Sequence, residues 1–199
     1  SLVETYRYAA EINAVHVNNL GAFYGVANPT GFTRLKDYID AKAMYDVNVN
    51  YVELVDKFFD GYFAEAAEPM REMFEYLRLW FARCLKDNNW GWSANMNGSI
   101  SGSMEFVKQG DIVTMFRHLD DAYSKIEMYK KDPAKYASLK SHIDMEWLFP
   151  AKVSVSNDTG LFTESQLAEI KTNFKTYVRT LGIQYIKEFT SIEPFINSL

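Results

Sequence analysis

The histidines and the single cysteine are the first side chains to consider for metal ligation or nucleophilic catalysis. His16, His118 and His142 are never four residues apart, so the helical two-histidine zinc signature is missing. Cys84 lies on the apolar stripe of a predicted helix, which indicates a small core residue rather than a nucleophile. Two aspartates closely follow His118, which is typical of a solvated helix face. The sequence also lacks a glycine-rich phosphate loop, a nucleophile elbow and a kinase signature, so it predicts no cofactor and no metal.

His16 has a different context, because it lies on a predicted strand next to two asparagines and just before a glycine-rich loop. Barrel enzymes place site residues where a strand ends and a loop begins. The same position also suits a histidine that only satisfies hydrogen bonds within the fold. Both interpretations stay open for His16, Asn18 and Asn19.

Hydrolysis of a glycosidic bond needs two opposed carboxyl groups at a defined separation. The chain has 26 acidic residues, but their spacing singles out no such pair. Four glutamates between residues 65 and 75 recur at helical spacing, which predicts the solvated side of an amphipathic helix. They are Glu65, Glu68, Glu72 and Glu75.

A long polar loop with two tryptophans, predicted over 87–103, is the strongest local anomaly. The flat indoles of Trp90 and Trp92 suit stacking on the apolar face of a sugar ring. The asparagines in the loop offer donors and acceptors that suit sugar hydroxyl groups. Three interpretations stay open: the indoles anchor the loop to the helices, contact a sugar, or contact a protein.

Composition narrows the function classes further. With 48% apolar and 16% aromatic residues, the chain of 199 residues can bury a core, which excludes bulk disorder. The net charge of −5 argues against nucleic-acid binding through phosphate neutralisation. One cysteine excludes an intramolecular disulfide, and no run of about 18 apolar residues predicts a membrane span.

The elements that must position these residues are mostly helices. Periodicity predicts a mainly α fold, a helical bundle of about six helices with one or two short strands. The helices are expected over 2–13, over 32–45, from Asn50, over 65–86, over 104–130 with an interruption at Gly110, from Asp132 with a bend or a stop near Pro150, and from Thr163 to Gly182. A strand is expected at 14–18, loops at 19–31 and 153–162, and a short strand with a last helical turn in 183–199.

Three predicted helices carry capping signals. Asn50 with Glu53, and Thr163 with Gln166, have the spacing of a capping box, and Asp132 precedes a proline at a first helical position. The apolar spacing then selects the buried face of each helix. The expected inward residues include Val3, Tyr6, Ala10 and Ile12; Phe32, Leu35, Ile39 and Ala43; Val52, Val55, Phe58, Phe59 and Tyr62; and Tyr136, Leu139, Ile143 and Trp147.

Residues 31–81, which begin GFTRLKDYIDAKAMYDVNVNYVELVDKFFDGYFAEAAEPM, resemble a bacterial family. Proteins of this family are of unknown function, accompany polysaccharide degradation, and are similar to the helical region that follows the barrel in bacterial α-glucuronidases. Tyr45-Asp46-Val47 stands where the family usually has Trp-Asp-Pro. The matching residues are Leu35, Tyr38, Ala41, Lys42, Tyr45, Asp46, Phe58, Phe59, Tyr62, Phe63, Ala66 and Ala67.

The resemblance implies that residues 1–30 are the last strand and loop of a (β/α)8 barrel, and that 31–199 form an α-helical C-terminal domain. The chain would be a non-catalytic, periplasmic or extracellular region of a glycoside-hydrolase-like, carbohydrate-active protein. It would brace the barrel, contact the remainder of the parent chain, and help shape a cleft for an oligo- or polysaccharide. The implied sugar-binding residues are Trp90, Trp92, His16, Asn18, Asn19 and Tyr24.

A second hypothesis belongs to another class. An acidic helical bundle with exposed aromatic residues also suits a stand-alone module that binds a protein through a central aromatic anchor, or that binds sugar without hydrolysis. A strand at 14–18 needs a neighbour for its backbone groups, either near 183–189 or in chain that precedes Ser1. The first hypothesis expects a barrel upstream of Ser1, whereas the second does not.

Overall fold

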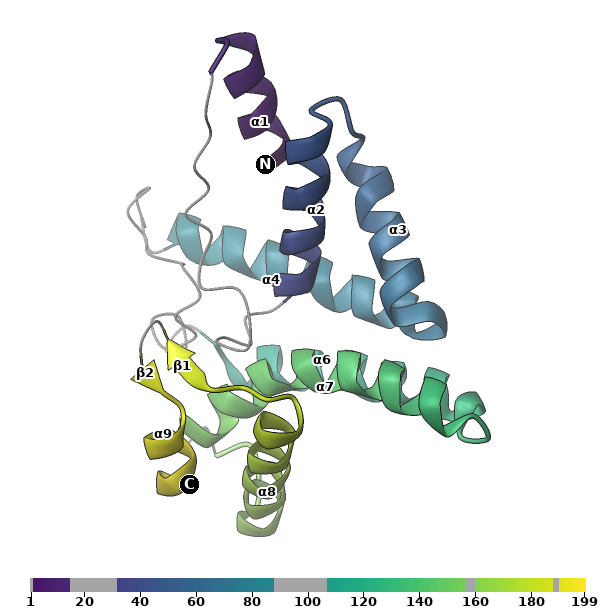
Figure 1. Cartoon of the computed structure of the whole chain (residues 1–199). Helices are drawn as coiled ribbons and strands as arrows, with labels where there is room; N and C mark the ends of the chain where they lie inside the picture. The colour runs from purple at the N-terminus through teal and green to yellow at the C-terminus, as the bar shows by residue number, and fades with distance from the viewer. Residues whose placement is uncertain (1, 15–31, 88–106, 157–159, 188–189) are drawn as a thin grey trace.

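The computed structural model describes residues 2–14, 32–87, 107–156, 160–187 and 190–199. These residues are mainly helical, as the sequence predicts (Figure 1). The predicted strand at 14–18 and the loops at 19–31 and 87–103 lie outside the described residues, apart from Ala14, which is not in a strand, and Asp87, which ends a helix. The helices are α1 (Leu2–Glu11), α2 (Thr33–Tyr45), α3 (Tyr51–Phe63), η1 (Ala64–Ala66), α4 (Ala67–Asp87), α6 (Gln109–Ile126), η3 (Glu127–Tyr129), α7 (Pro133–Ser156), α8 (Glu164–Thr180) and α9 (Glu193–Ser198).

The helices form successive layers. The first three, α1 to α3, lie together at one end of the molecule, and α4 crosses beneath them (Figure 1). On its other side α4 packs on α6, α6 packs on α7, and α7 packs on α8. One hydrophobic core runs through these layers, so the described helices form one packed bundle. Helix α1 contributes Val3 and Tyr6 to this core.

The strands form a small hairpin near the carboxyl end. Strand β1 (Tyr185–Lys187) pairs antiparallel with β2 (Thr190–Ser191), and Tyr185 lies opposite Ser191. The predicted short strand and final helical turn in 183–199 are therefore confirmed. Since the described partner of β1 is β2, the pairing of 14–18 with residues near 183–189 gains no support.

The predicted capping residues begin their helices. Asn50 accepts hydrogen bonds from two first-turn amides of α3, including that of Glu53 at 3.4 Å. Thr163 and Gln166 form a reciprocal capping box at the start of α8. Asp132 accepts a hydrogen bond from the Lys135 amide, in the first turn of α7, at 3.1 Å. Each bond satisfies an amide that has no partner within the helix, so these helix starts were predictable from local chemistry.

Helix α7 continues to Ser156, so it does not stop near Pro150 and the predicted loop does not begin at 153, whereas the predicted alternative of a bend near Pro150 stays a prediction. Proline in a helix interior costs about 3 kcal/mol and frees one carbonyl. Here most side chains of 143–154 are buried, and this burial outweighs the local cost. Ser154 Oγ also donates to the Pro150 carbonyl at 2.8 Å.

Other differences lie at helix ends. Ile12 is 57% exposed because α1 ends at Glu11, and Ala10 is also exposed. Val52 is 62% exposed in the first turn of α3. Helix α6 begins at Gln109, so Gly110 lies in its first turn rather than at an interruption. On α2, the predicted inward residues Leu35, Ile39 and Ala43 are buried.

Four phenylalanines form the centre of the core between α2, α3 and α4. Phe32, immediately before α2, lies 5.7 Å from Phe59, 6.3 Å from Phe63 and 5.3 Å from Phe74, measured between ring centroids. Phe32 adopts a left-handed conformation with φ of 57°, which is unfavourable for a bulky side chain. Contacts with the rest of the fold must therefore hold Phe32 in this conformation.

Helix α8 ends at a glycine, as predicted. Gly182 has φ of 68°, a conformation that glycine adopts without a Cβ clash. Its amide donates to the Arg179 carbonyl, and the Ile183 amide donates to the Val178 carbonyl. This is the Schellman arrangement, in which Ile183 is also buried. No described helix is long and apolar enough to cross a bilayer.

Candidate functional site

The sugar-binding residues predicted from the sequence lie outside the described residues. The structure therefore neither brings them together nor separates them, and they stay predictions. They are Trp90, Trp92, His16, Asn18, Asn19 and Tyr24. The described residues offer other features to consider. They are a pocket on α4, several ionisable side chains within the fold, and a polar network that joins α6, α7 and α8.

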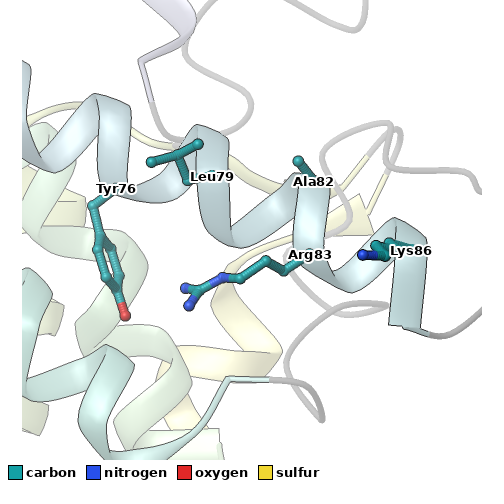
Figure 2. A pocket seen from close by; sticks show the side chains of 5 residues that line it. All are labelled: Tyr76, Leu79, Ala82, Arg83 and Lys86. Atoms are coloured by element: carbon teal, nitrogen blue, oxygen red, sulfur yellow. The ribbon is translucent and has the colours of Figure 1, made fainter.

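The pocket lies on one face of the carboxyl-terminal half of α4, and its volume is about 420 Å³ (Figure 2). That volume is within the range of small-molecule sites. Positions 76, 79, 83 and 86 are separated by three, four and three residues, which places them on one helix face. The described lining residues are Tyr76, Leu79, Ala82, Arg83 and Lys86.

The apolar wall of the pocket has a fixed aromatic ring. The Tyr76 hydroxyl donates a short hydrogen bond to Asp111 Oδ1, and Asp111 Oδ2 accepts the Lys108 amide at 2.9 Å at the start of α6. Burial and the Asp111 carboxylate raise the pKa of Tyr76, so its hydroxyl remains a donor at neutral pH. Asp111 therefore both caps α6 and orients the ring.

The pocket also carries two cationic side chains. Figure 2 shows Arg83 extending back towards the Tyr76 ring, with Lys86 further along the helix. The Arg83 guanidinium carbon lies 5.9 Å from the ring centroid. Elsewhere on α4, Arg71 pairs with Asp56 and Arg78 pairs with Glu75. Among the described residues, no carboxylate forms an ion pair with Arg83 or Lys86.

His118 is buried, which corrects its predicted place on a solvated helix face. It faces α4, where its Nδ1 lies 3.3 Å from Glu72 Oε2, although this contact lacks hydrogen-bond geometry. Burial and the Arg117 charge lower the pKa of His118 against the opposing effect of Glu72. The ring is thus a mostly neutral core group between α4 and α6. The predicted solvated glutamates are mostly exposed, as expected.

His142 is a packing residue. Its ring stacks on Tyr62 with centroids 3.7 Å apart, and its Nδ1 lies 2.6 Å from the Tyr62 carbonyl oxygen. That short contact requires a proton on Nδ1, so the nitrogen is a donor. Burial lowers the pKa of His142. Within the described residues, no group of three or more histidine, cysteine or acidic side chains could hold a metal ion.

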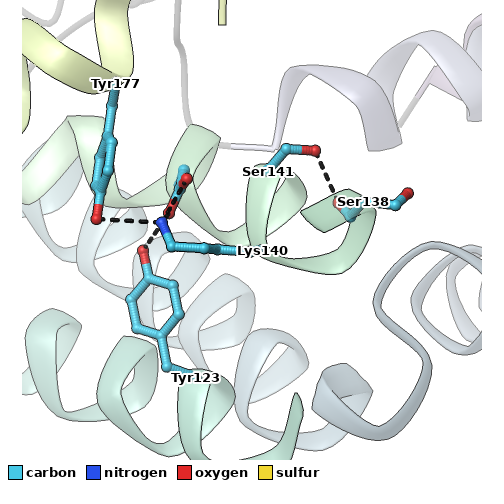
Figure 3. A network of polar contacts seen from close by, with 6 residues as sticks. Tyr123, Ser138, Lys140, Ser141 and Tyr177 are labelled. Atoms are coloured by element: carbon cyan, nitrogen blue, oxygen red, sulfur yellow. Dashed lines mark hydrogen bonds and ion pairs between the residues drawn. The ribbon is translucent and has the colours of Figure 1, made fainter. Parts of the chain in front are cut away.

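A polar network joins α6, α7 and α8 (Figure 3). Lys140 Nζ donates to both oxygens of Asp144, at 2.7 and 2.8 Å, and to the Tyr177 hydroxyl at 3.3 Å. The Tyr123 hydroxyl donates to Asp144 Oδ1 at 2.8 Å. Burial and the Asp144 charge raise the pKa of Tyr123, so this hydroxyl is not a general base. The paired groups hold three helices together.

Glu146 is a buried carboxyl group on α7, 2% exposed. Its Oε2 accepts the Phe32 amide at 2.7 Å, so it holds the left-handed residue that begins α2. Burial raises the pKa of Glu146 to about 8, although this hydrogen bond and the charge of Lys36 oppose the shift. The carboxyl group is therefore largely protonated at neutral pH, and it supports the fold rather than a reacting centre.

Lys152 is a second buried ionisable group on α7, 4% exposed. Burial lowers its pKa to about 8. Its ammonium lies 5.7 Å from the centroid of the Phe195 ring, and no carboxylate in the described part of the chain pairs with it. The sequence could have indicated Glu146, because it interrupts an otherwise apolar stretch of a predicted helix, whereas Lys152 follows Pro150, near which that helix was expected to bend or stop. Sequence analysis missed both, and it also missed the spacing of the α4 pocket.

No protein-family model matches this chain, and the search of curated proteins and that of solved structures each give no match. The described residues thus define a mainly helical bundle with one candidate ligand pocket and with buried polar groups that serve packing.

Proposed function

We propose that this chain is a non-catalytic helical region that braces a neighbouring domain of a glycoside-hydrolase-like, carbohydrate-active protein. One observation carries the proposal: five large apolar side chains on or next to α1, α2 and α3 are exposed. Large exposed apolar side chains are candidates for a protein interface. They are Tyr8, Ile12, Met44, Tyr45 and Val52, and we call them the apolar end.

The three elements that carry the apolar end are joined by hydrogen bonds. Arg7 on α1 donates to the Val47 carbonyl at 2.9 Å and to the Val49 carbonyl at 2.8 Å, both in the connection between α2 and α3. Tyr6 donates to Asp40 on α2 at 2.7 Å. Figure 1 shows α1 beside the carboxyl-terminal half of α2. The apolar end therefore belongs to one assembled part of the fold.

The charges around the apolar end favour a partner with basic groups at its rim. Glu11 precedes Ile12, Asp46 follows Tyr45, and Glu53 follows Val52. Glu53 also lies 3.9 Å from Lys57, so this carboxylate is partly neutralised. We expect the association to weaken as salt concentration rises, because exposed charge pairs are screened.

The resemblance identifies the proposed partner as a barrel that precedes Ser1 in the same protein. Helix α1, the first in the chain, carries part of the apolar end, so a preceding domain would meet it directly. Within the bundle, Asp144, Glu146 and His142 serve contacts between elements of the fold. A periplasmic or extracellular location belongs to the same proposal.

The docking prediction uses the protein region that the same reading frame encodes upstream of Ser1, expressed separately. We expect it to bind this chain, and we expect Tyr45→Asp to weaken binding at least about tenfold, because Tyr45 is 93% exposed and would lie at the interface. Met128→Asp is the matched control, since Met128 is 67% exposed on η3. Calorimetric titration measures both affinities.

Equal affinities for Tyr45→Asp and wild type would contradict docking through the apolar end. A start codon or signal peptide directly before Ser1 would overturn the bracing role. The apolar end would then favour the second candidate function, a stand-alone module that binds a separate protein.

The sugar-cleft part of the proposal rests on the resemblance and on the indoles of Trp90 and Trp92. We expect Trp90→Ala and Trp92→Ala each to weaken binding of an oligosaccharide by about five- to tenfold, because each removes a stacking surface. Trp147→Phe serves as a packing control. Unchanged glycan binding in both variants would remove the tryptophans from the site, and turnover of a nitrophenyl glucuronide by this chain would contradict its non-catalytic role.

A further inference from the structure

We propose that the α4 pocket binds a small carboxylate with an apolar body. The carboxylate lies at Arg83 and Lys86, and the apolar body lies along Leu79, Ala82 and the Tyr76 ring. This inference does not rest on the bracing role, because the pocket and the apolar end lie on different elements. It assigns a ligand class to the pocket, a surface that the proposed docking does not use.

The apolar wall has surface to bury. Leu79 is 54% exposed, although it is large and apolar, and Ala82 beside it is also exposed. Covering apolar surface contributes about 25 cal/mol per Å², so a short alkyl or aromatic body would gain free energy on this wall. The Tyr76 ring adds a rigid face, since Asp111 holds its hydroxyl.

The two cationic side chains have the chemistry for a carboxylate. The Arg83 guanidinium lies over the Tyr76 ring and also hydrogen-bonds with the Tyr76 side chain, and its remaining N–H groups can donate two parallel hydrogen bonds to a carboxylate. Lys86 adds a second charge in the last turn of α4. The described residues supply no carboxylate in an ion pair with either cation, so a ligand carboxylate would not have to displace one of them.

The charges around the pocket are not uniform. Asp111 lies at the Tyr76 end, and the Arg83 guanidinium reaches back to the same ring, whereas Lys86 lies nearer the end of α4. The carboxyl end of a helix carries partial negative charge, which disfavours anions. The two cationic side chains must therefore supply the attraction, and removing either should be measurable.

Binding of octanoate to the isotopically labelled whole chain tests the proposal, with backbone amide shifts as the readout. We expect octanoate to shift amides of residues 76–86 and to bind at least about fivefold more tightly than octan-1-ol, octylammonium or acetate. Octan-1-ol and octylammonium lack the negative charge, and acetate lacks the apolar body. Equal binding of octanoate and octan-1-ol, or of octanoate and acetate, would overturn the proposal.

Variants separate the pocket from general anion binding. We expect Arg83→Gln and Lys86→Gln each to weaken octanoate binding by about two- to tenfold, because each removes one exposed charge contact. Arg78→Gln is the matched control, since Arg78 is on α4, pairs with Glu75 and does not line the pocket. All three positions are exposed, so we expect the variants to fold.

A second variant pair tests the apolar wall. We expect Leu79→Ser to weaken octanoate binding by about threefold or more, whereas Val113→Ser, which changes a side chain 51% exposed on α6, should leave it unchanged. Equal effects of Arg83→Gln and Arg78→Gln, or of Leu79→Ser and Val113→Ser, would overturn the proposed pocket. None of these outcomes depends on whether an upstream domain binds the apolar end.

Discussion

The Asp144→Ala variant should lose about 2–3 kcal/mol of its free energy of unfolding. Asp144 is buried and accepts hydrogen bonds from Lys140 and Tyr123, so its removal leaves an ammonium and a hydroxyl without their acceptor. Lys140 keeps a third of its side-chain surface exposed, which limits the loss because water can reach the charge. Denaturant unfolding at pH 7 measures the change.

The double variant Lys140→Met/Asp144→Leu is the informative control. It removes both charges and keeps side chains of similar size, so we expect it to be more stable than Asp144→Ala. Asp120→Ala changes an exposed aspartate on α6 and should alter stability by less than about 0.5 kcal/mol. A loss for Asp144→Ala no larger than that for Asp120→Ala would show that the network does not stabilise the bundle.

The second large effect concerns the pH dependence of stability. The pKa of Glu146 is raised by burial to about 8, whereas an unfolded chain releases this proton near the ordinary value of 4.5. Between these values the folded state binds more protons than the unfolded state. The free energy of unfolding contributed by Glu146 therefore falls as pH rises from about 4.5 to about 8 and is constant above that, by an amount on the order of a few kcal/mol.

The Glu146→Gln variant tests this sign. The glutamine amide oxygen can still accept the Phe32 amide, but the side chain cannot ionise. We expect the variant to be more stable than wild type by about 1 kcal/mol or more at pH 8, and the difference to shrink towards pH 5. Glu169→Gln, on the exposed surface of α8, is the control. Unfolding curves at five pH values give the comparison.

Other ionisable groups do not confuse this test. The lowered pKa values of His118 and His142 make stability rise with pH below about 6.5, but they contribute equally to wild type and variant. The lowered pKa of Lys152, about 8, acts above pH 8, where stability rises with pH. We expect the difference in unfolding free energy between wild type and Glu146→Gln to change between pH 5 and 8. A constant difference would contradict the raised pKa of Glu146.

Local chemistry explains which parts of the fold were predictable. The starts of α3, α7 and α8 follow from Asn50, Asp132 and Thr163, because a capping side chain acts on amides two or three residues away. The end of α8 follows from Gly182 for the same reason. Of the two predicted outcomes at Pro150, a bend or a stop, the stop does not occur, because burial of most side chains of 143–154 outweighs a local proline cost.

The candidate sites show the same difference between local properties and properties that depend on tertiary packing. The sequence alone determined that the chain is acidic, mainly helical and capped at particular residues, because these properties depend on composition and on neighbours within one or two turns. Only the tertiary structure decided that His118 is buried, that Glu146 holds Phe32, and that Arg83 joins an apolar wall. Glu146 and Phe32 are 114 residues apart. Burial and partners at such separations depend on how helices pack, which no local pattern encodes.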